Sequence, residues 1–230
     1  MTARMTKLGS LEVLKEKGLD VSTVIDIGVH RHTPELIKAF PDKPHLLFEP
    51  VTEYYEDIKT NYAAINYTLF PIALSSESSE GFLRTFDISG LGSVSHSSIS
   101  TEGGEGTRPI HIAALDDVLK ARNDDTPYLI KLDVDGAEMQ ILRGAIAALQ
   151  KTDCVIIECP VSIDTNMFFD RANFIREHGF VLWDIVDFCY YKNQLSQVDL
   201  VFIKQHVKQT KFSPWNEGSF DQAQWNAMFQ

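Results

Sequence analysis

The sequence has little that would suit a membrane, a secretory route or nucleic acid. No apolar run approaches the roughly 20 residues that span a bilayer, and the opening segment MTARMTKLGSLEVLKEKG has no continuous apolar stretch typical of a secretory signal. Lys and Arg are not clustered and the net charge is -11, so no basic surface for a phosphate backbone is predicted. We therefore expect a cytoplasmic protein with no membrane span and no nucleic-acid partner.

Cysteine is also scarce, since only Cys154, Cys159 and Cys189 occur. An odd number cannot pair completely, and two of the three lie in or beside an apolar run typical of a buried strand. We interpret them as small buried residues of a reduced protein, in preference to metal ligands or a redox pair. The length of 230 residues is sufficient for one α/β domain with a buried core.

Apolar runs alternate with helical patterns along most of the chain. Continuous runs are typical of strands in a parallel sheet that is covered on both faces, and their alternation with helices predicts a doubly wound α/β fold. The runs are 21–27, 45–49, 66–74, 128–134, 154–159, 179–188 and 197–204.

Several helices have recognisable start signals. We expect a first helix over Leu11 to Lys17 with Ser10 as its N-cap, a second that starts at Pro34, and a third that opens at Thr52. The segment GAEMQILRGAIAALQ, residues 136–150, has apolar residues at helical spacing and predicts one further helix.

A Ser- and Gly-rich insert over residues 75–108 interrupts the alternation. Its FLRTF and RPIHI segments predict an antiparallel ribbon with a long tip from Asp87 to Thr107, which we expect either to cover an active site or to be disordered. We assign residues 1–206 to the main domain and 207–230 to an aromatic tail. That tail contains Phe212, Trp215, Trp225 and Phe229 and would dock on the body or on a partner chain, so a homodimer is one expectation.

The first loop, in VIDIGVHRH, keeps only one of the glycines of a dinucleotide-binding turn. Without the further glycines of GxGxxG, close approach to a pyrophosphate is not expected. Glu49 follows Asp26 at a spacing suited to accept hydrogen bonds from both ribose hydroxyls, and Asp26 would receive an ammonium group or tie down the loop. A nucleoside that carries an amino acid fits this pair, and S-adenosylmethionine is such a molecule.

These motifs together resemble the FkbM family of class I S-adenosylmethionine-dependent methyltransferases. The resemblance runs from about Val21 to Lys204 and rests on VIDIG, FEP, PIALSS, LDDVL, KLDVDGAEMQILRGA, VIIE, HGFVLWDI and QVDLVFI. It implies a Rossmann-like, mostly parallel seven-stranded sheet whose last strand is antiparallel, and O-methylation of a hydroxyl on a sugar, glycan or related natural product. The residues it implies for the cofactor are Asp26, Gly28, Val29, His30, Glu49, Pro50, Ala73, Leu74 and Asp133.

Methyl transfer to a hydroxyl needs alignment and a group that takes up a proton. We expect Asp133 to be the base or the residue that orients the acceptor, with Glu158 as second candidate because an idle carboxylate in so apolar a run would be costly. His96 would reach the acceptor if the Ser-rich insert covers the site. Lys131 would pair with Asp133 or another carboxylate.

Two further interpretations of the acidic residues stay open. Asp135 and Glu138 have the D-x-x-E spacing of a capping box, which would explain them without catalysis. Carboxylates at adjacent strand ends would also suit a divalent metal such as Mg²⁺, although nothing in the spacing demands one.

The sequence therefore supports three hypotheses of different classes. The first is an O-methyltransferase that acts on a small-molecule or glycan hydroxyl. The second is a binding or regulatory protein that is built on the same fold and does not use the cofactor productively. The third is a methyltransferase with a nitrogen or carboxylate acceptor.

Overall fold

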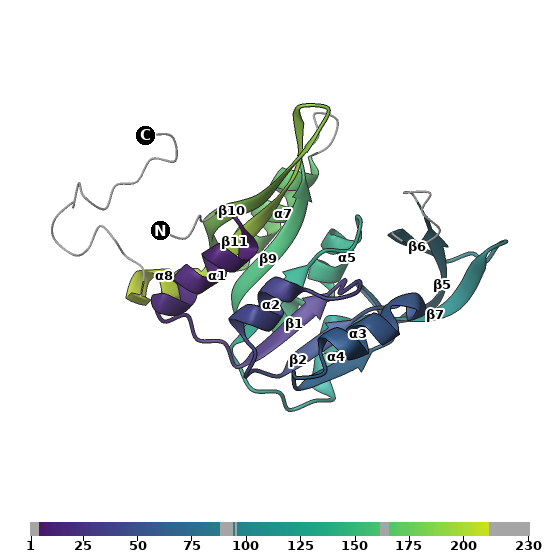
Figure 1. Ribbon diagram of the computed structural model, residues 1–230, viewed down its shortest axis with the longest axis horizontal. Coiled ribbons are helices and arrows are strands. Elements are labelled where there is room, and N and C mark those ends of the chain that lie inside the picture. Colours follow the sequence, from purple (N-terminus) through teal and green to yellow (C-terminus); the bar gives the residue numbers. More distant parts are fainter. Residues whose placement is uncertain (1–4, 88–93, 95, 162–165, 212–230) are drawn as a thin grey trace.

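The computed structural model describes residues 5–87, 94, 96–161 and 166–211, which form two sheets with helices around the larger one (Figure 1). The large sheet has the strand order β10-β11-β9-β8-β1-β2-β3. Its strands are β1 (Thr23–Ile27), β2 (His45–Phe48), β3 (Tyr67–Phe70), β8 (Tyr128–Leu132), β9 (Thr152–Pro160), β10 (Phe180–Tyr191) and β11 (Gln194–Lys204).

The winding direction of this sheet changes between β1 and β8. From β1 the chain proceeds through β2 to β3 on one side, and from β8 to β9 on the other, with all of these pairs parallel. Strand β11 is antiparallel to both β9 and β10. These pairings confirm the predicted doubly wound, mostly parallel seven-stranded sheet with an antiparallel last strand. In such sheets, ligands bind at the carboxyl ends of the strands where the winding direction changes, which here are β1 and β8.

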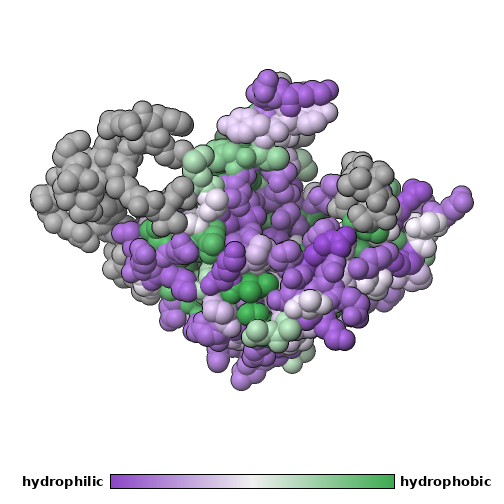
Figure 2. Space-filling model, viewed as in Figure 1, coloured by the Kyte–Doolittle hydropathy of each residue, from purple (hydrophilic) through white to green (hydrophobic). Residues whose placement is uncertain are grey.

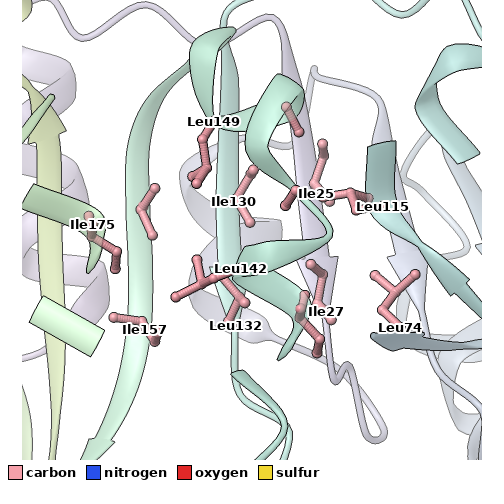
Figure 3. Packing of buried hydrophobic residues seen from close by; sticks show 14 of the residues in the cluster. Ile25, Ile27, Leu74, Leu115, Ile130, Leu132, Leu142, Leu149, Ile157 and Ile175 are labelled. Atoms are coloured by element: carbon pink, nitrogen blue, oxygen red, sulfur yellow. The ribbon is translucent and has the colours of Figure 1, made fainter. Parts of the chain in front are cut away.

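Alternate residues of the central strands pack against helices on opposite faces. On one face, Ile25, Ile130 and Ile157 contact residues of α4 (Leu115–Lys120), α5 (Glu138–Arg143), α6 (Ile146–Gln150) and α7 (Met167–Glu177), and Figure 3 shows these side chains pointing into one cluster. On the other face, Val24 and Leu129 pack against α1 (Lys7–Glu16), α2 (Pro34–Ala39) and α8 (Gln205–Lys211). The continuous apolar runs therefore serve a sheet that is covered on both faces.

The structure corrects two of the expected helices and adds detail to a third, which opens at Thr52 as expected. Helix α1 begins at Lys7, because the Thr6 hydroxyl accepts a hydrogen bond from the Gly9 amide at 3.1 Å and so replaces Ser10 as N-cap. The third helix opens with a single 3₁₀ turn, η1 (Thr52–Tyr54), before α3 (Tyr55–Asn61). The single helix predicted over 136–150 is divided into α5 and α6.

The Ser- and Gly-rich insert forms most of a second sheet, with the order β4-β7-β5-β6. Its strands are β4 (Ala73–Ser75), β5 (Ser79–Phe86), β6 (His96–Ser100) and β7 (Thr107–Ala114). The predicted ribbon is confirmed, since β5 and β7 pair antiparallel with Phe82 opposite Pro109. Within the predicted tip, Asp87 to Thr107, the structure has a further strand, β6, which pairs antiparallel with β5.

The run predicted over 66–74 is likewise two strands, which belong to different sheets. Strand β3 ends before Pro71, and β4 joins the small sheet parallel to β7. Proline has no amide hydrogen to donate to a ladder, so the chain leaves the large sheet there. Figure 1 shows the β10–β11 hairpin and the β5–β7 ribbon at opposite ends of the large sheet.

The surface in this view is mostly hydrophilic, with apolar residues in small patches (Figure 2). In the described part of the chain, no helix is both long and apolar enough to cross a membrane. Residues 207–211 of the predicted aromatic tail belong to α8. Residues 212–230, which contain its aromatic side chains, fall outside the described residues.

Candidate active site

A cavity of about 550 Å³ opens where the carboxyl ends of β1, β2 and β8 meet the small sheet. The predicted residues that line it are Gly28, His30, Glu49, Pro50, Ala73, Leu74, His96 and Asp133. Tyr54, Gln140 and a series of serines also line it, and the sequence did not single these out. The cavity is therefore the candidate active site.

Gly28 allows the first loop to pass directly over the end of β8. Its φ is +78°, and a Cβ atom at this position would lie 1.8 Å from the main-chain oxygen of Asp133. His30 has a φ of +55°, a conformation in which histidine is enriched among the residues other than glycine. One glycine is thus sufficient for the close approach, and the left-handed turn continues through His30.

Glu49 connects this loop to the end of β2. Its carboxylate accepts hydrogen bonds from the amides of His30 at 2.7 Å and Val51 at 2.9 Å. Burial raises the pKa of Glu49 to about 7, and the two amides oppose that rise. The His30 ring also packs against Tyr54 in a tilted arrangement, with 4.1 Å between ring centroids. The turn is therefore held by contacts that do not depend on a second glycine.

Asp26 and Val29 differ from their expected positions, because neither lines the cavity. Asp26 is fully buried beneath it, where the Tyr62 hydroxyl donates to its Oδ2 at 3.2 Å and the Lys131 ammonium lies 3.4 Å from its Oδ1. Val29 is buried in the apolar cluster around α3. The observed contacts of Asp26 correspond to the predicted role of tying down the loop.

Lys131 joins the first loop to Asp133. Its ammonium donates to the Gly28 carbonyl at 2.7 Å and lies 3.4 Å from the Asp133 carboxylate, so the predicted ion pair is confirmed. Burial opposes ionisation of Asp133, but Lys131 and Lys7 outweigh it and lower the pKa of this carboxyl below its ordinary value. Asp133 therefore presents a carboxylate to the cavity at neutral pH.

Glu158 does not line the cavity and lies behind Asp133. Its side chain is hydrogen-bonded to Asp133, and its Oε1 accepts from the Gln197 amide group. Burial, together with the nearby charges of Asp133 and Asp199, raises the pKa of Glu158 to about 8. The two carboxyls thus share one proton, which resides on Glu158 because Lys131 pairs with Asp133.

The cluster of charged side chains around Asp133 and Glu158 extends across the sheet to Asp199 and Lys7, which were not predicted from the sequence. Asp199 of β11 is directly opposite Glu158 of β9. Lys7 of α1 reaches it at 2.8 Å and also lies 3.4 Å from Glu35 and 3.5 Å from Asp187. The only signal in the sequence was an acidic residue within the apolar run QVDLVFIK, because the partner of Asp199 is distant along the chain.

The interpretation of Asp135 and Glu138 as a capping box is wrong. The N-cap of α5 is Ala137, without a side-chain cap, and Asp135 has a φ of +56°. Glu138 is buried in an ion pair with Arg171, and its other oxygen accepts from the Gly136 amide at 3.2 Å. Asp135 instead lines the cavity, where its carboxylate lies 4.0 Å from the His96 ring.

The structure forms no site for the divalent metal that was considered as an alternative, within the part of the chain that it describes. Among those residues, no three His, Cys, Asp or Glu side chains converge in a way that could hold a metal ion. The carboxylate of Asp133 is paired with Lys131 instead.

Comparison with known proteins gives a family match and a partial relative. A family model described as the methyltransferase FkbM domain matches residues 26–182. The hexuronic acid methyltransferase AglP of Haloferax volcanii is 27% identical over 117 residues, which cover 51% of this chain and 47% of AglP. The chain thus matches about half the length of this curated relative.

Two solved structures superpose on most of the chain at low identity. Fibrillarin from Aeropyrum pernix with bound S-adenosyl-L-methionine is 9% identical with a TM-score of 0.45, over 85% of this chain and 74% of that one. An rRNA methylase from Streptococcus thermophilus is 12% identical with a TM-score of 0.49, over 89% of this chain and 98% of that one.

Proposed function

The chain belongs to the FkbM methyltransferase family, and on that premise we propose that it transfers a methyl group from S-adenosylmethionine to a hydroxyl group of a sugar or glycan. A sugar acceptor is supported by the name of AglP, a hexuronic acid methyltransferase to which half of this chain is similar. The observation that carries the proposal is the cavity itself, in which Glu49 and Asp133 lie on either side of the Gly28 turn.

The residues of the cavity fit the cofactor. Its volume of about 550 Å³ is within the usual range of small-molecule sites. Glu49 offers a nearly buried carboxylate to the ribose hydroxyls, and Ala73 and Leu74 offer apolar surface to the adenine. When bound, S-adenosylmethionine supplies an electrophilic methyl group on a sulfonium. The protein must then hold an acceptor oxygen in line with that methyl group.

Asp133 is suited to orient the acceptor hydroxyl. Its carboxylate faces the cavity and stays ionised at neutral pH because of Lys131 and Lys7. It can accept the hydroxyl hydrogen bond and take up the proton as the oxygen is methylated. Glu158 keeps its proton, donates a hydrogen bond to Asp133 and acts as a positioning residue. His96, elsewhere on the cavity wall, is the second residue within reach of an acceptor.

The test combines a transfer assay with a binding assay. The protein is incubated with methyl-labelled S-adenosylmethionine and a panel of glycosides, and labelled methyl ethers are identified by mass spectrometry. Asp133→Asn should lower kcat by about 100-fold or more, while calorimetry should show cofactor affinity within about threefold of wild type, equivalent to less than 1 kcal/mol. Asp20→Asn, which changes an exposed residue far from the cavity wall, is the matched control.

The outcomes separate the three hypotheses. Labelled methyl ethers that depend on Asp133 support the proposal. Absence of cofactor binding would favour the binding or regulatory protein. Methyl amines or methyl esters as the sole products would identify a nitrogen or carboxylate acceptor, and equal losses of turnover and affinity in Asp133→Asn would make Asp133 a binding residue.

A further inference from the structure

One part of the cavity wall is rich in hydroxyl groups. It is formed by β6 with the residue that follows it, by the end of β4 with the residues that follow it, and by the start of β5. The serine and threonine residues on it are Ser75, Ser76, Ser79, Ser97, Ser98, Ser100 and Thr101, and Gln140 also lines the cavity. Hydroxyls and amides both donate and accept hydrogen bonds, so this wall matches the edge of a polyhydroxyl molecule.

The formal charges on the same cavity have one sign. Glu49, Glu77, Asp133 and Asp135 line it, whereas none of the described residues that line it is Lys or Arg. Residues 88–93 and 95, which the structure does not describe, read ISGLGS and Ser and contain no basic residue. The Lys131 ammonium is buried and is already paired with Asp26, Asp133 and the Gly28 carbonyl. The Arg31 guanidinium, which lies 5.4 Å from the ring centroid of Tyr54, is paired with Asp57.

The two histidines on the wall do not provide a counter-charge for an anion. Burial, followed by the positive charge of Arg31, lowers the pKa of His30, so its ring is neutral at pH 7. His96 faces Asp135 at 4.0 Å, and that carboxylate would offset any positive charge on the ring.

Bound S-adenosylmethionine would bring its own sulfonium, ammonium and carboxylate, and its positive charges would face Glu49 and Asp133. A further carboxylate, on the acceptor, would lose water without gaining a side-chain cation among the described lining residues, and Asp135 and Glu77 would repel it.

We propose that the acceptor is an uncharged sugar and that the cavity discriminates against sugars that carry a carboxylate. This inference rests on the proposed function and adds the charge of the substrate to it. Discrimination arises here from repulsion as well as from attraction, since the serine-rich wall would accept the hydroxyls of either sugar, while Asp135 and Glu77 disfavour only the acid.

The test uses sugars that differ only at one carbon. Glucose, galactose and mannose are supplied as matched 4-nitrophenyl glycosides and 4-nitrophenyl glycuronides, in which CH₂OH is replaced by a carboxylate. Methyl transfer from labelled S-adenosylmethionine is measured at pH 7.5 and low salt. We expect kcat/KM for the accepted neutral sugar to exceed that of its uronic acid by about tenfold or more, which is the order of effect of one like-charge contact in a partly solvated site.

A charge-neutral variant tests whether the carboxylates cause the preference. Asparagine tolerates the positive φ of residue 135, so Asp135→Asn removes the charge without straining the backbone. It should lower the ratio of kcat/KM for the neutral sugar to kcat/KM for its uronic acid several-fold. The control Asp20→Asn should leave this ratio unchanged. Added salt should narrow the wild-type ratio as well, because ions screen exposed charges.

Each result has a distinct meaning. A preference for the glycuronides would overturn this inference and leave sugar O-methylation standing. A neutral-sugar preference that Asp135→Asn and salt both fail to narrow would overturn the electrostatic cause that we assign to it. Cofactor binding without methyl transfer to any glycoside in the panel would overturn the proposed function, and the inference with it.

Discussion

Replacing Glu158 by glutamine should stabilise the protein progressively as the pH rises. In the folded protein Glu158 keeps its proton up to a pKa of about 8, whereas an unfolded glutamate ionises near 4.5. Between these values the native state binds more protons than the unfolded state, so the stability contributed by this residue falls as pH rises. Glutamine cannot ionise, so Glu158→Gln removes this loss. Its amide retains a donor toward Asp133 and an acceptor for Gln197.

The structure sets the size of the effect. A pKa of about 8 in place of 4.5 corresponds to at most roughly 5 kcal/mol. Glu158 is not fully buried and it titrates together with Asp133, so we expect about 2–3 kcal/mol. The difference in free energy of unfolding between Glu158→Gln and wild type should grow by that amount from pH 5 to pH 8.5.

Urea unfolding monitored by circular dichroism at several pH values measures this difference. Glu12→Gln removes an exposed carboxylate from α1 and is the matched control. Its difference from wild type in free energy of unfolding should change by less than about 0.5 kcal/mol over this pH range. A difference between Glu158→Gln and wild type that stays constant over this range would refute the shared proton. A difference that falls with pH would place the proton on Asp133 instead.

The remaining predictions concern the cofactor turn and the contact between α1 and the sheet. Glu49→Ala should weaken S-adenosylmethionine binding about tenfold or more, measured by calorimetry with Glu56→Ala as control, and unchanged affinity would place the ribose elsewhere. Because the pKa of Glu49 is about 7, wild-type affinity should fall as the pH is lowered from 8 to 6, since a protonated carboxyl loses acceptor capacity; affinity independent of pH would contradict this. Gly28→Ala should destabilise the fold by about 3 kcal/mol or more, whereas Gly104→Ala, whose added Cβ meets nothing within 4 Å, should be tolerated. Lys7→Met should cost about 2–4 kcal/mol in urea unfolding because Asp199 loses its partner, and a loss no larger than that of exposed Lys59→Met would show the ion pair to be dispensable.

The central strands could be predicted from sequence because their signal is local. Burial of both faces of a parallel sheet requires continuous apolar runs, and the runs at 21–27, 128–134 and 154–159 correspond to β1, β8 and β9. The small sheet was recognised only in part. Strand β6 has the sequence HSSIS and is mostly exposed, so it lacks the apolar alternation that predicts a strand.

The site was predictable to the extent that its residues follow strand ends. Glu49 and Asp133 do so, and both line the cavity. The wall formed by Ser97 and Ser98 depends on how β6 pairs with β5, and the link from Asp199 to Lys7 depends on the packing of α1 on β11. Such contacts join residues far apart in sequence, and a single sequence has no local pattern that reports them.

The altered first loop illustrates why a motif and its geometry are separate requirements. A second glycine would normally allow positive φ and close approach within the turn. Here the close approach is confined to Gly28, above the main chain of Asp133, and Gly28 itself has a positive φ. The second positive φ of the turn is at His30, which is not a glycine. That strain is offset by the hydrogen bond from the His30 amide to Glu49 and by the packing of the His30 ring against Tyr54. The same carboxylate that is proposed to bind the ribose therefore also holds the turn, which is why Glu49→Ala should affect cofactor affinity more than the loss of a single ribose contact would suggest.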